Sequence, residues 1–215
     1  MDMQIFAVKN LIGSSPVRLT ITGGLSGSYN SACAAKHLYE TEHKGRRVFV
    51  LDSRSAGPEI GLVVEKLREY VLAGKSFEDI CREITEYLSH TGLIFMLKSL
   101  KNFANNGRVS PLVAKIVGVV GICVVGRADE KGTLEPTHKC RGEAKSLETL
   151  VEDLGAHGFS GGRVKIGHCM NETAAQELKA KILKKYPQAE VAVETMSGLC
   201  YYYAEKGGLL VGFEA

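Results

Sequence analysis

The stretch that most constrains this chain covers residues 20–31, Thr-Ile-Thr-Gly-Gly-Leu-Ser-Gly-Ser-Tyr-Asn-Ser. It is typical of the end of an apolar strand, a tight glycine-rich turn and the start of a helix. Glycine lets other groups approach the backbone N–H groups closely, and a helix N-terminus adds unpaired donors and partial positive charge. With the hydroxyls of Ser26 and Ser28, the turn predicts a binding site for an anion, either phosphate or carboxylate. A capped strand-to-helix turn without a ligand fits the same residues.

The composition is that of a globular chain and excludes several classes of function. With 215 residues, the chain can form one large domain or two small ones with a real core. A net charge of +3, spread along the chain, does not favour nucleic acid as a partner. The six cysteines form no CxxC pair, which indicates a reduced, cytoplasmic protein without disulfides or a metal site. The apolar run at residues 112–125 is too short to span a bilayer and no signal peptide is recognised, so no integral membrane association is expected.

Strands and helices alternate in the first half of the chain. We expect a strand at residues 17–22, a helix at 31–40 and a strand at 47–51, which predicts a βαβ unit with a parallel sheet. Ligands bind beyond the carboxyl ends of parallel strands, so Ser26 and Asp52 are expected on one edge of the sheet. Asp52 suits a loop-ordering Asx turn, with a catalytic acid as the alternative.

Two further helices are expected before the fold changes. One covers residues 57–72, and the capping box Ser76-Phe-Glu-Asp79 opens another that runs to about residue 88. We place the domain boundary after this helix. The sequence therefore predicts an N-terminal α/β domain of residues 1–91 and a C-terminal α/β domain of residues 92–215.

The second half predicts a mixed sheet with helices. A strand at residues 92–97 leads to Asn105-Asn-Gly107, which suits a left-handed helix end and displays Arg108 on a fixed corner. The apolar segment 112–125 and a strand at 133–140, separated by a polar turn, indicate a hairpin. Further helices are expected at residues 144–154 and 172–186, and further strands at 163–168, 190–195 and 209–213.

The glycine-rich turn at residues 23–28, which we call the serine turn, resembles a hydrolase motif but lacks part of it. Gly24-Leu-Ser26-Gly-Ser28 is close to the G-x-S-x-G nucleophile elbow, but a serine replaces the last glycine. A hydrolase would also need an acid and a histidine, for which Asp52 and His168 are the candidates. The turn contains neither a Gly-Lys-Ser/Thr sequence nor a G-x-G-x-x-G fingerprint, so no nucleotide cofactor is expected. The alternative functions are therefore a serine-dependent hydrolase and an enzyme that uses the same turn on a phosphate ligand.

Three basic side chains flank strands or glycines, namely Arg108, Arg141 and His168. Each could point into a cleft, but taken singly each fits a solvated surface charge better. Arg141 is the strongest candidate of the three, because it stands beside Gly142 at a strand-to-helix junction.

In their order along the chain, these motifs resemble the DegV family. Residues 21–32 are similar to the family motif I-S-S-x-L-S-G-T-Y-x-S-A. The resemblance continues through five segments: Val50-Leu-Asp-Ser53, Gly74-Lys-Ser76, Asn106-Gly-Arg-Val-Ser110, Lys139-Cys-Arg-Gly142 and Gly207-Gly-Leu-Leu-Val-Gly-Phe213. It therefore spans nearly the whole chain.

The resemblance implies a bacterial, cytoplasmic protein with two α/β domains and one long-chain fatty acid in a buried tunnel between them. Some members present the fatty acid to a separate fatty acid kinase subunit, so the binding protein is not itself an enzyme. The apolar segment 113–125 is a candidate for the tunnel wall.

The resemblance also implies which residues bind the ligand. Ser26 would hydrogen-bond the carboxylate beside the backbone of Gly27, and the arginines would meet an acyl phosphate or the kinase. The ligand-binding residues expected on this basis are Ser26, Gly27, Ser28, Gly24, Arg108 and Arg141.

The sequence departs from the family pattern at two places. The family carries an upstream Thr-Ser-x-x-Pro motif whose threonine also holds the carboxylate, and no residue before Met1 supplies it, so the family's N-terminal segment is expected to be missing. A histidine near the end of the family pattern is replaced by a tyrosine within residues 201–203. On this interpretation the serine turn forms only part of the family's head-group site.

Overall fold

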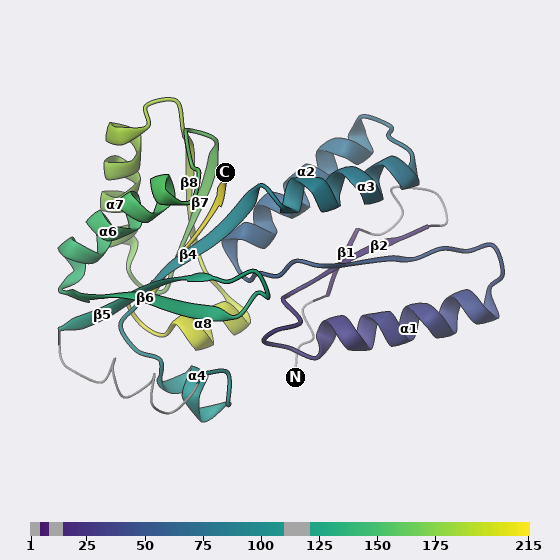
Figure 1. Ribbon diagram of the computed structural model, residues 1–215, viewed down its shortest axis with the longest axis horizontal. Helices are drawn as coiled ribbons and strands as arrows, with labels where there is room; N and C mark the ends of the chain where they lie inside the picture. The colour runs from purple at the N-terminus through teal and green to yellow at the C-terminus, as the bar shows by residue number, and fades with distance from the viewer. Residues whose placement is uncertain (1–4, 9–14, 110–120) are drawn as a thin grey trace. The chain divides into compact units, whose positions relative to one another are not determined.

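The computed structural model describes residues 5–8, 15–109 and 121–215 and forms two units (Figure 1). Contacts assign Met1–Ala56, Val63–His90 and Glu130–Thr133 to the first unit. Gly57–Leu62, Thr91–Asp129 and Leu134–Ala215 form the second. The two units thus interleave along the chain, and the division into domains of residues 1–91 and 92–215 stays a prediction.

The first unit contains a three-stranded sheet in the order β1-β2-β3. Strands β2 (Val17–Thr20) and β3 (Phe49–Asp52) are parallel and are connected by helix α1 (Ser28–Glu42), which confirms the predicted βαβ unit. Strand β1 (Ile5–Val8) pairs antiparallel with β2. Sequence reasoning missed β1, because the residues around it show no regular hydrophobic period.

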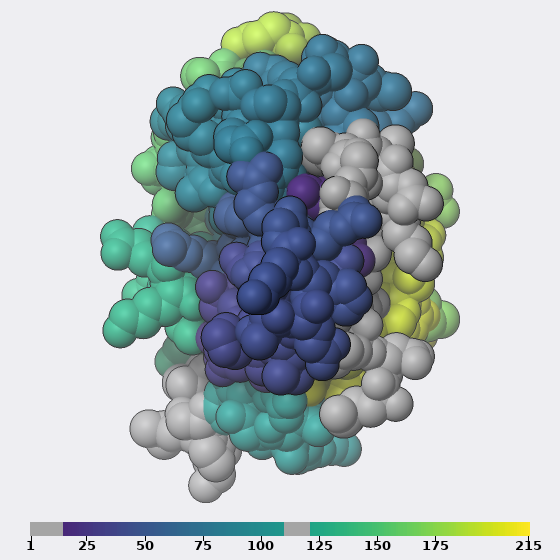
Figure 2. Space-filling model, turned by 90° about the vertical axis from the view of Figure 1, so that its right-hand side faces the viewer, coloured from purple at the N-terminus to yellow at the C-terminus, as the bar shows by residue number. Residues whose placement is uncertain are grey.

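Helix α1 lies at the surface of the first unit. Its buried side chains are Ser28 and Ala32, and Leu38 is 64% exposed. Figure 2 shows this part of the chain, in purple and blue, at the front of the view. Most of α1 therefore contributes little apolar packing, and the contacts at its first turn position it on the sheet.

Helices α2 (Pro58–Leu72) and α3 (Phe77–Leu88) follow the expected ranges closely. The predicted capping box opens α3: Ser76 Oγ accepts a hydrogen bond from the Asp79 N–H at 3.1 Å and donates one to the Asp79 carboxylate at 2.6 Å. Ile80 and Ile84, one turn apart, are fully buried. The cap therefore fixes where the helix starts, and the apolar stripe fixes which face it buries.

The second unit contains a six-stranded sheet in the order β6-β5-β4-β9-β7-β8. Strands β7 and β8 are parallel and all other neighbours in this sheet are antiparallel, so the predicted mixed sheet is confirmed. The strands are β4 (Thr91–Leu97), β5 (Ile122–Ala128), β6 (Leu134–Arg141), β7 (Arg163–His168), β8 (Glu190–Thr195) and β9 (Leu209–Glu214). The expected apolar segment of residues 112–125 lies partly outside the described residues, and its last part forms the start of β5.

Helices cover both faces of this sheet. Along β4, Ile94 and Met96 join one apolar cluster with residues of α6 (Glu143–Ala156) and α7 (Glu172–Lys185). Leu93, Phe95 and Leu97 join a second cluster with residues of α4 (Lys101–Asn105) and α8 (Gly198–Ala204). Figure 1 shows these two pairs of helices on opposite sides of the sheet. Successive side chains of β4 thus point to opposite faces of the sheet, and both faces are apolar because helices cover both. Helix α8 was not expected from the sequence.

Among the described residues, no helix combines the length and the apolar character that crossing a membrane requires.

We expect Ser76→Ala to lower the free energy of unfolding by about 1 kcal/mol at neutral pH, because it removes the cap of α3. The hydrogen bond from Ser76, together with Arg82, lowers the pKa of Asp79. Stability that depends on the ionised Asp79 is present above its unfolded pKa and is lost as the pH falls. Urea denaturation at several pH values should therefore show the gap between wild type and variant narrowing in acid. Equal stability at neutral pH would contradict the capping role.

Candidate functional site

The serine turn, residues 23–28, connects β2 to α1, and its first N–H groups are bonded within the protein. The N–H of Gly23 donates to both carboxylate oxygens of Asp52, at 3.1 and 3.2 Å. The N–H of Gly24 donates to Thr22 Oγ1 at 3.0 Å, and that of Ser26 donates to the Thr22 carbonyl at 3.2 Å. The start of the turn is therefore closed to an external anion.

At the other end of the turn, some donors have no partner within the described residues. Gly27 is the N-cap residue of α1 and has no side chain to cap the helix, and the first turn of α1 contains no acidic residue. Ser26 Oγ accepts a hydrogen bond from the Ser28 N–H at 3.2 Å, which leaves the Ser26 O–H to donate elsewhere. Ser28 is 6% exposed, and its Oγ has no hydrogen-bond partner in the part of the chain that the structure describes.

These groups converge on one kind of ligand. Within the described residues the Gly27 N–H meets no acceptor, so it adds a third donor to the hydroxyls of Ser26 and Ser28. Two hydroxyls and a main-chain N–H at a helix N-terminus suit a small anion with two oxygens. The site therefore has the donors that a carboxylate needs.

Asp52 orders the loop rather than facing a histidine. Besides the Gly23 N–H, its Oδ1 accepts the N–H of Arg54, two residues on, at 3.0 Å. This is the Asx turn that the sequence favours. The carboxylate is therefore committed to main-chain donors, and the alternative role of catalytic acid has no support in its contacts.

The tip of the β5–β6 hairpin, Glu130–Thr133, belongs by its contacts to the first unit. The hydroxyl of Thr22 lies 3.4 Å from the Lys131 carbonyl and donates to it. Gly132 has φ +71°, and a Cβ there would collide with Thr22 Oγ1 and lie 2.6 Å from the Arg54 carbonyl. A Cβ on Gly24 would lie 2.7 Å from the Lys131 carbonyl. The absence of side chains at Gly24 and Gly132 therefore lets the tip pack directly on the serine turn, a contact that no local pattern signals.

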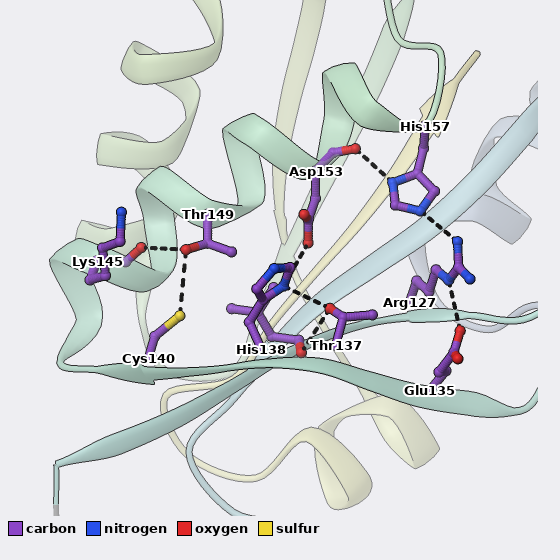
Figure 3. A network of polar contacts seen from close by, with 10 residues as sticks. Arg127, Glu135, Thr137, His138, Cys140, Lys145, Thr149, Asp153 and His157 are labelled. Atoms are coloured by element: carbon purple, nitrogen blue, oxygen red, sulfur yellow. Dashed lines mark hydrogen bonds and ion pairs between the residues drawn. The ribbon is translucent and has the colours of Figure 1, made fainter.

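The second unit holds a polar network between β5, β6 and α6 (Figure 3). Arg127 donates to Glu135 at 2.8 Å and to Nε2 of His157 at 2.8 Å. Nδ1 of His157 donates to the Asp153 carbonyl at 2.7 Å, and the Asp153 carboxylate lies 3.6 Å from Nδ1 of His138. Burial raises the pKa of Asp153, and the positive charge of Arg127 opposes this shift. Sequence reasoning missed this network, because its members lie apart in the chain.

The network does not offer a metal site. Among the described residues, no group of three or more His, Cys, Asp or Glu side chains is placed to hold a metal ion. Its members instead bond to one another and to the main chain of α6, which indicates a structural role.

The three basic candidates all lie in the second unit. Arg108 follows Gly107, whose φ of +68° confirms the left-handed corner, and its guanidinium donates to the Asn106 carbonyl at 2.5 Å. Arg141 is exposed at the end of β6. Because Ser26 belongs to the first unit, the grouping of both arginines with it in one site stays a prediction.

His168 is not the surface charge that the sequence suggested. It is 6% exposed at the end of β7. Its Nδ1 accepts the Asn171 N–H at 3.4 Å, which leaves Nε2 to donate to Thr195 Oγ1 at 3.3 Å. Both ring nitrogens are therefore used in the core of the second unit, and neither serves as the base of a catalytic serine.

Comparison with known families identifies the chain. A family model described as "Uncharacterised protein, DegV family" matches residues 12–215. The chain belongs to the DegV family. A DegV domain-containing protein of Streptococcus pneumoniae is 44% identical over 196 residues, which cover 91% of this chain and 70% of that protein.

Solved DegV structures share the fold. A DegV family protein of Eubacterium eligens, loaded with heptadecanoic acid, is 42% identical with a TM-score of 0.90, over 94% of this chain and 73% of that one. The Streptococcus pneumoniae fatty acid kinase (Fak) B3 protein, loaded with linoleic acid, is 44% identical with a TM-score of 0.88. That match covers 91% of this chain and 70% of the other. The DegV resemblance and the α/β fold class predicted from the motifs are thereby confirmed.

We expect Gly132→Ala to destabilise the protein by about 2–3 kcal/mol, through strain at positive φ and overlap with Thr22 and Arg54. Gly74→Ala is the matched control, because Gly74 has φ +69° but no neighbour within 4 Å of an added Cβ. Gly74→Ala should lower the free energy of unfolding by about 1 kcal/mol, because only the strain of an alanine at positive φ is added there. Equal losses for the two variants in chemical denaturation would mean that the hairpin tip does not pack on the turn.

We expect Asp153→Asn to change how stability depends on pH. Because the folded pKa of Asp153 is raised, its protonated form contributes stability below the unfolded pKa that is lost as the pH rises. The stability of wild type relative to Asp153→Asn should thus fall as the pH rises above about 4, the ordinary pKa of an aspartate in an unfolded chain. Thermal melts would measure this. Asp79→Asn should give the opposite slope, since the pKa of Asp79 is lowered, and parallel slopes would contradict the assignment.

Proposed function

We propose that this chain binds a long-chain fatty acid and holds its carboxylate at the end of the serine turn where α1 begins. One observation carries the proposal: within the residues that the structure describes, Ser28 Oγ is buried without a partner at the N-terminus of α1, beside the Ser26 hydroxyl and the Gly27 N–H. The relatives loaded with heptadecanoic acid and linoleic acid support the same class of ligand.

The charges around the turn favour a carboxylate over a phosphate. The Asp52 carboxylate, which accepts the Gly23 N–H, is a negative charge beside the turn. It repels a ligand with one negative charge less than a ligand with two. The turn itself contains no lysine or arginine to offset a second charge. A carboxylate needs no such partner when hydroxyls and main-chain N–H groups bind it at a helix N-terminus.

The acyl chain would supply most of the affinity. Each buried CH₂ contributes about 0.8 kcal/mol, so a long chain in a dry tunnel outweighs a modest head-group contribution. The proposed wall at residues 113–125 falls mainly outside the described residues, and its role stays a prediction.

We infer that the chain carries its ligand without transforming it and works in the cytoplasm. The Fak B3 relative is named for a fatty acid kinase, which supports a separate kinase as partner. In this proposal Arg108 and Arg141, both exposed, meet the kinase or the acyl phosphate that it forms. A serine hydrolase is the weaker alternative, because Ser26 Oγ bonds to the Ser28 N–H while Asp52 and His168 have partners of their own.

Native mass spectrometry of the purified chain tests the ligand class. We expect a bound mass that matches a long-chain fatty acid, or uptake of added heptadecanoic acid when the chain is purified empty. Failure to retain any fatty acid under either condition would refute the proposal. Hydrolysis of an ester that disappears in Ser26→Ala would instead favour the hydrolase.

We expect Ser26→Ala to release heptadecanoic acid about tenfold faster, which corresponds to one lost hydrogen bond to a charged group. The melting temperature of the empty protein should fall only slightly, because Ser26 is partly exposed and the variant loses its hydrogen bond from the Ser28 N–H. Ser31→Ala, at an exposed position of α1, is the control and should release the ligand as wild type does. Equal release from Ser26→Ala and Ser31→Ala would show that Ser26 does not hold the carboxylate.

A further inference from the structure

Two buried side-chain polar atoms lack a hydrogen-bond partner within the described part of the chain, and both lie beside the serine turn. One is Ser28 Oγ, and the other is Ser55 Oγ. Ser55 is 1% exposed and lies in the loop after β3. Because β2 and β3 are parallel, the segments that follow them leave the same edge of the sheet, and these segments carry Ser28, the first residue of α1, and Ser55.

Hydrogen bonds connect Ser55 to the serine turn. The Ser55 carbonyl accepts the N–H of Thr22 at 2.9 Å, and the Thr22 carbonyl accepts the N–H of Ser26 at 3.2 Å. One residue, Thr22, thus joins the backbone of Ser55 to that of the proposed carboxylate ligand Ser26. Ser55 is therefore bonded to the residue that directly precedes the turn, although 29 positions separate it from Ser26.

The backbone of Ser55 is held firmly while its hydroxyl is left unused. Ser53 Oγ donates to the Ser55 carbonyl at 3.0 Å and accepts the Ser55 N–H at 3.1 Å. The preceding residue, Arg54, has a φ of +50°, a left-handed conformation that L-residues adopt only when the surroundings impose it. A buried hydroxyl without a partner destabilises the empty protein relative to alanine. A polar ligand that accepts its proton removes that penalty.

We propose that Ser55 is a further ligand-binding residue and that its Oγ donates a hydrogen bond to the carboxylate of the bound fatty acid. The inference rests on the function proposed above and adds a second loop to the site. A carboxylate has two oxygens that together accept about four hydrogen bonds. The hydroxyls of Ser26, Ser28 and Ser55 and the Gly27 N–H provide that number of donors.

Ser55→Ala tests the proposal, because it should not destabilise the empty protein but should weaken retention of the ligand. Removing an unpartnered buried hydroxyl should leave the melting temperature of the empty protein unchanged or slightly raised. Loss of heptadecanoic acid to an excess of phosphatidylcholine vesicles should become about tenfold faster, as one hydrogen bond to a charged group is lost. Ser55→Cys, nearly the same in shape but a weak donor, should also release the ligand faster than wild type.

Ser53→Ala is the matched control, since the Ser53 hydroxyl makes two hydrogen bonds to the backbone of Ser55. It should lower the melting temperature of the empty protein, which Ser55→Ala should not. If Ser55→Ala lowers the melting temperatures of the empty and loaded forms equally, Ser55 has a structural role and the inference is overturned.

The release measurements give the remaining outcomes. Release from Ser55→Ala at the wild-type rate also overturns the inference, and it would mean that Ser55 meets only a buried water. If wild type itself retains no heptadecanoic acid, the proposed function fails, which is distinct from a failure at Ser55 alone.

Discussion

The geometry of the serine turn depends on the hydrogen bonds between the Gly23 N–H and the Asp52 carboxylate. They join the ends of the parallel strands β2 and β3, and a Cβ on Gly23 would approach Asp52 Oδ2 to 3.0 Å. Because this carboxylate occupies the first donor of the turn, an external anion can reach only the end where α1 begins. The same contact thus shapes the site and limits the charge that it can hold.

The turn is not built from local residues alone. Thr22 bonds through its N–H to Ser55, through its carbonyl to Ser26 and through its hydroxyl to the hairpin tip at Lys131. The tip approaches closely because Gly132 has no side chain. Two segments distant in sequence, the loop after β3 and the hairpin tip, therefore bond to Thr22, the residue whose carbonyl accepts the Ser26 N–H. Such a site is positioned more firmly than a loop that depends on its own turn residues.

Local patterns explain what the sequence could predict. The order of strand, glycine turn, helix and strand predicted the βαβ unit that is observed. The position of Asp52 at the end of β3 favoured the Asx turn, which is also observed. Strand β1 and helix α8 were missed, because each is short and lacks a clear period. The burial of His168 depends on Thr195, a partner in another strand. The packing of the hairpin tip on Thr22 joins residues 109 positions apart, and no local pattern reports such a contact.

The two unpartnered serines link stability to ligand binding. A buried hydroxyl without a partner costs about 1–3 kcal/mol, and Ser28 Oγ and Ser55 Oγ have no partner within the part of the chain that the structure describes. Replacing them with alanine would stabilise the empty chain but would leave the carboxylate with fewer donors. A ligand that binds only the folded state adds stability in proportion to the logarithm of its concentration over Kd. In the proposed site, the same hydroxyls lower the stability of the empty protein and bind the carboxylate of the ligand. Their hydrogen bonds are therefore complete only in the loaded form.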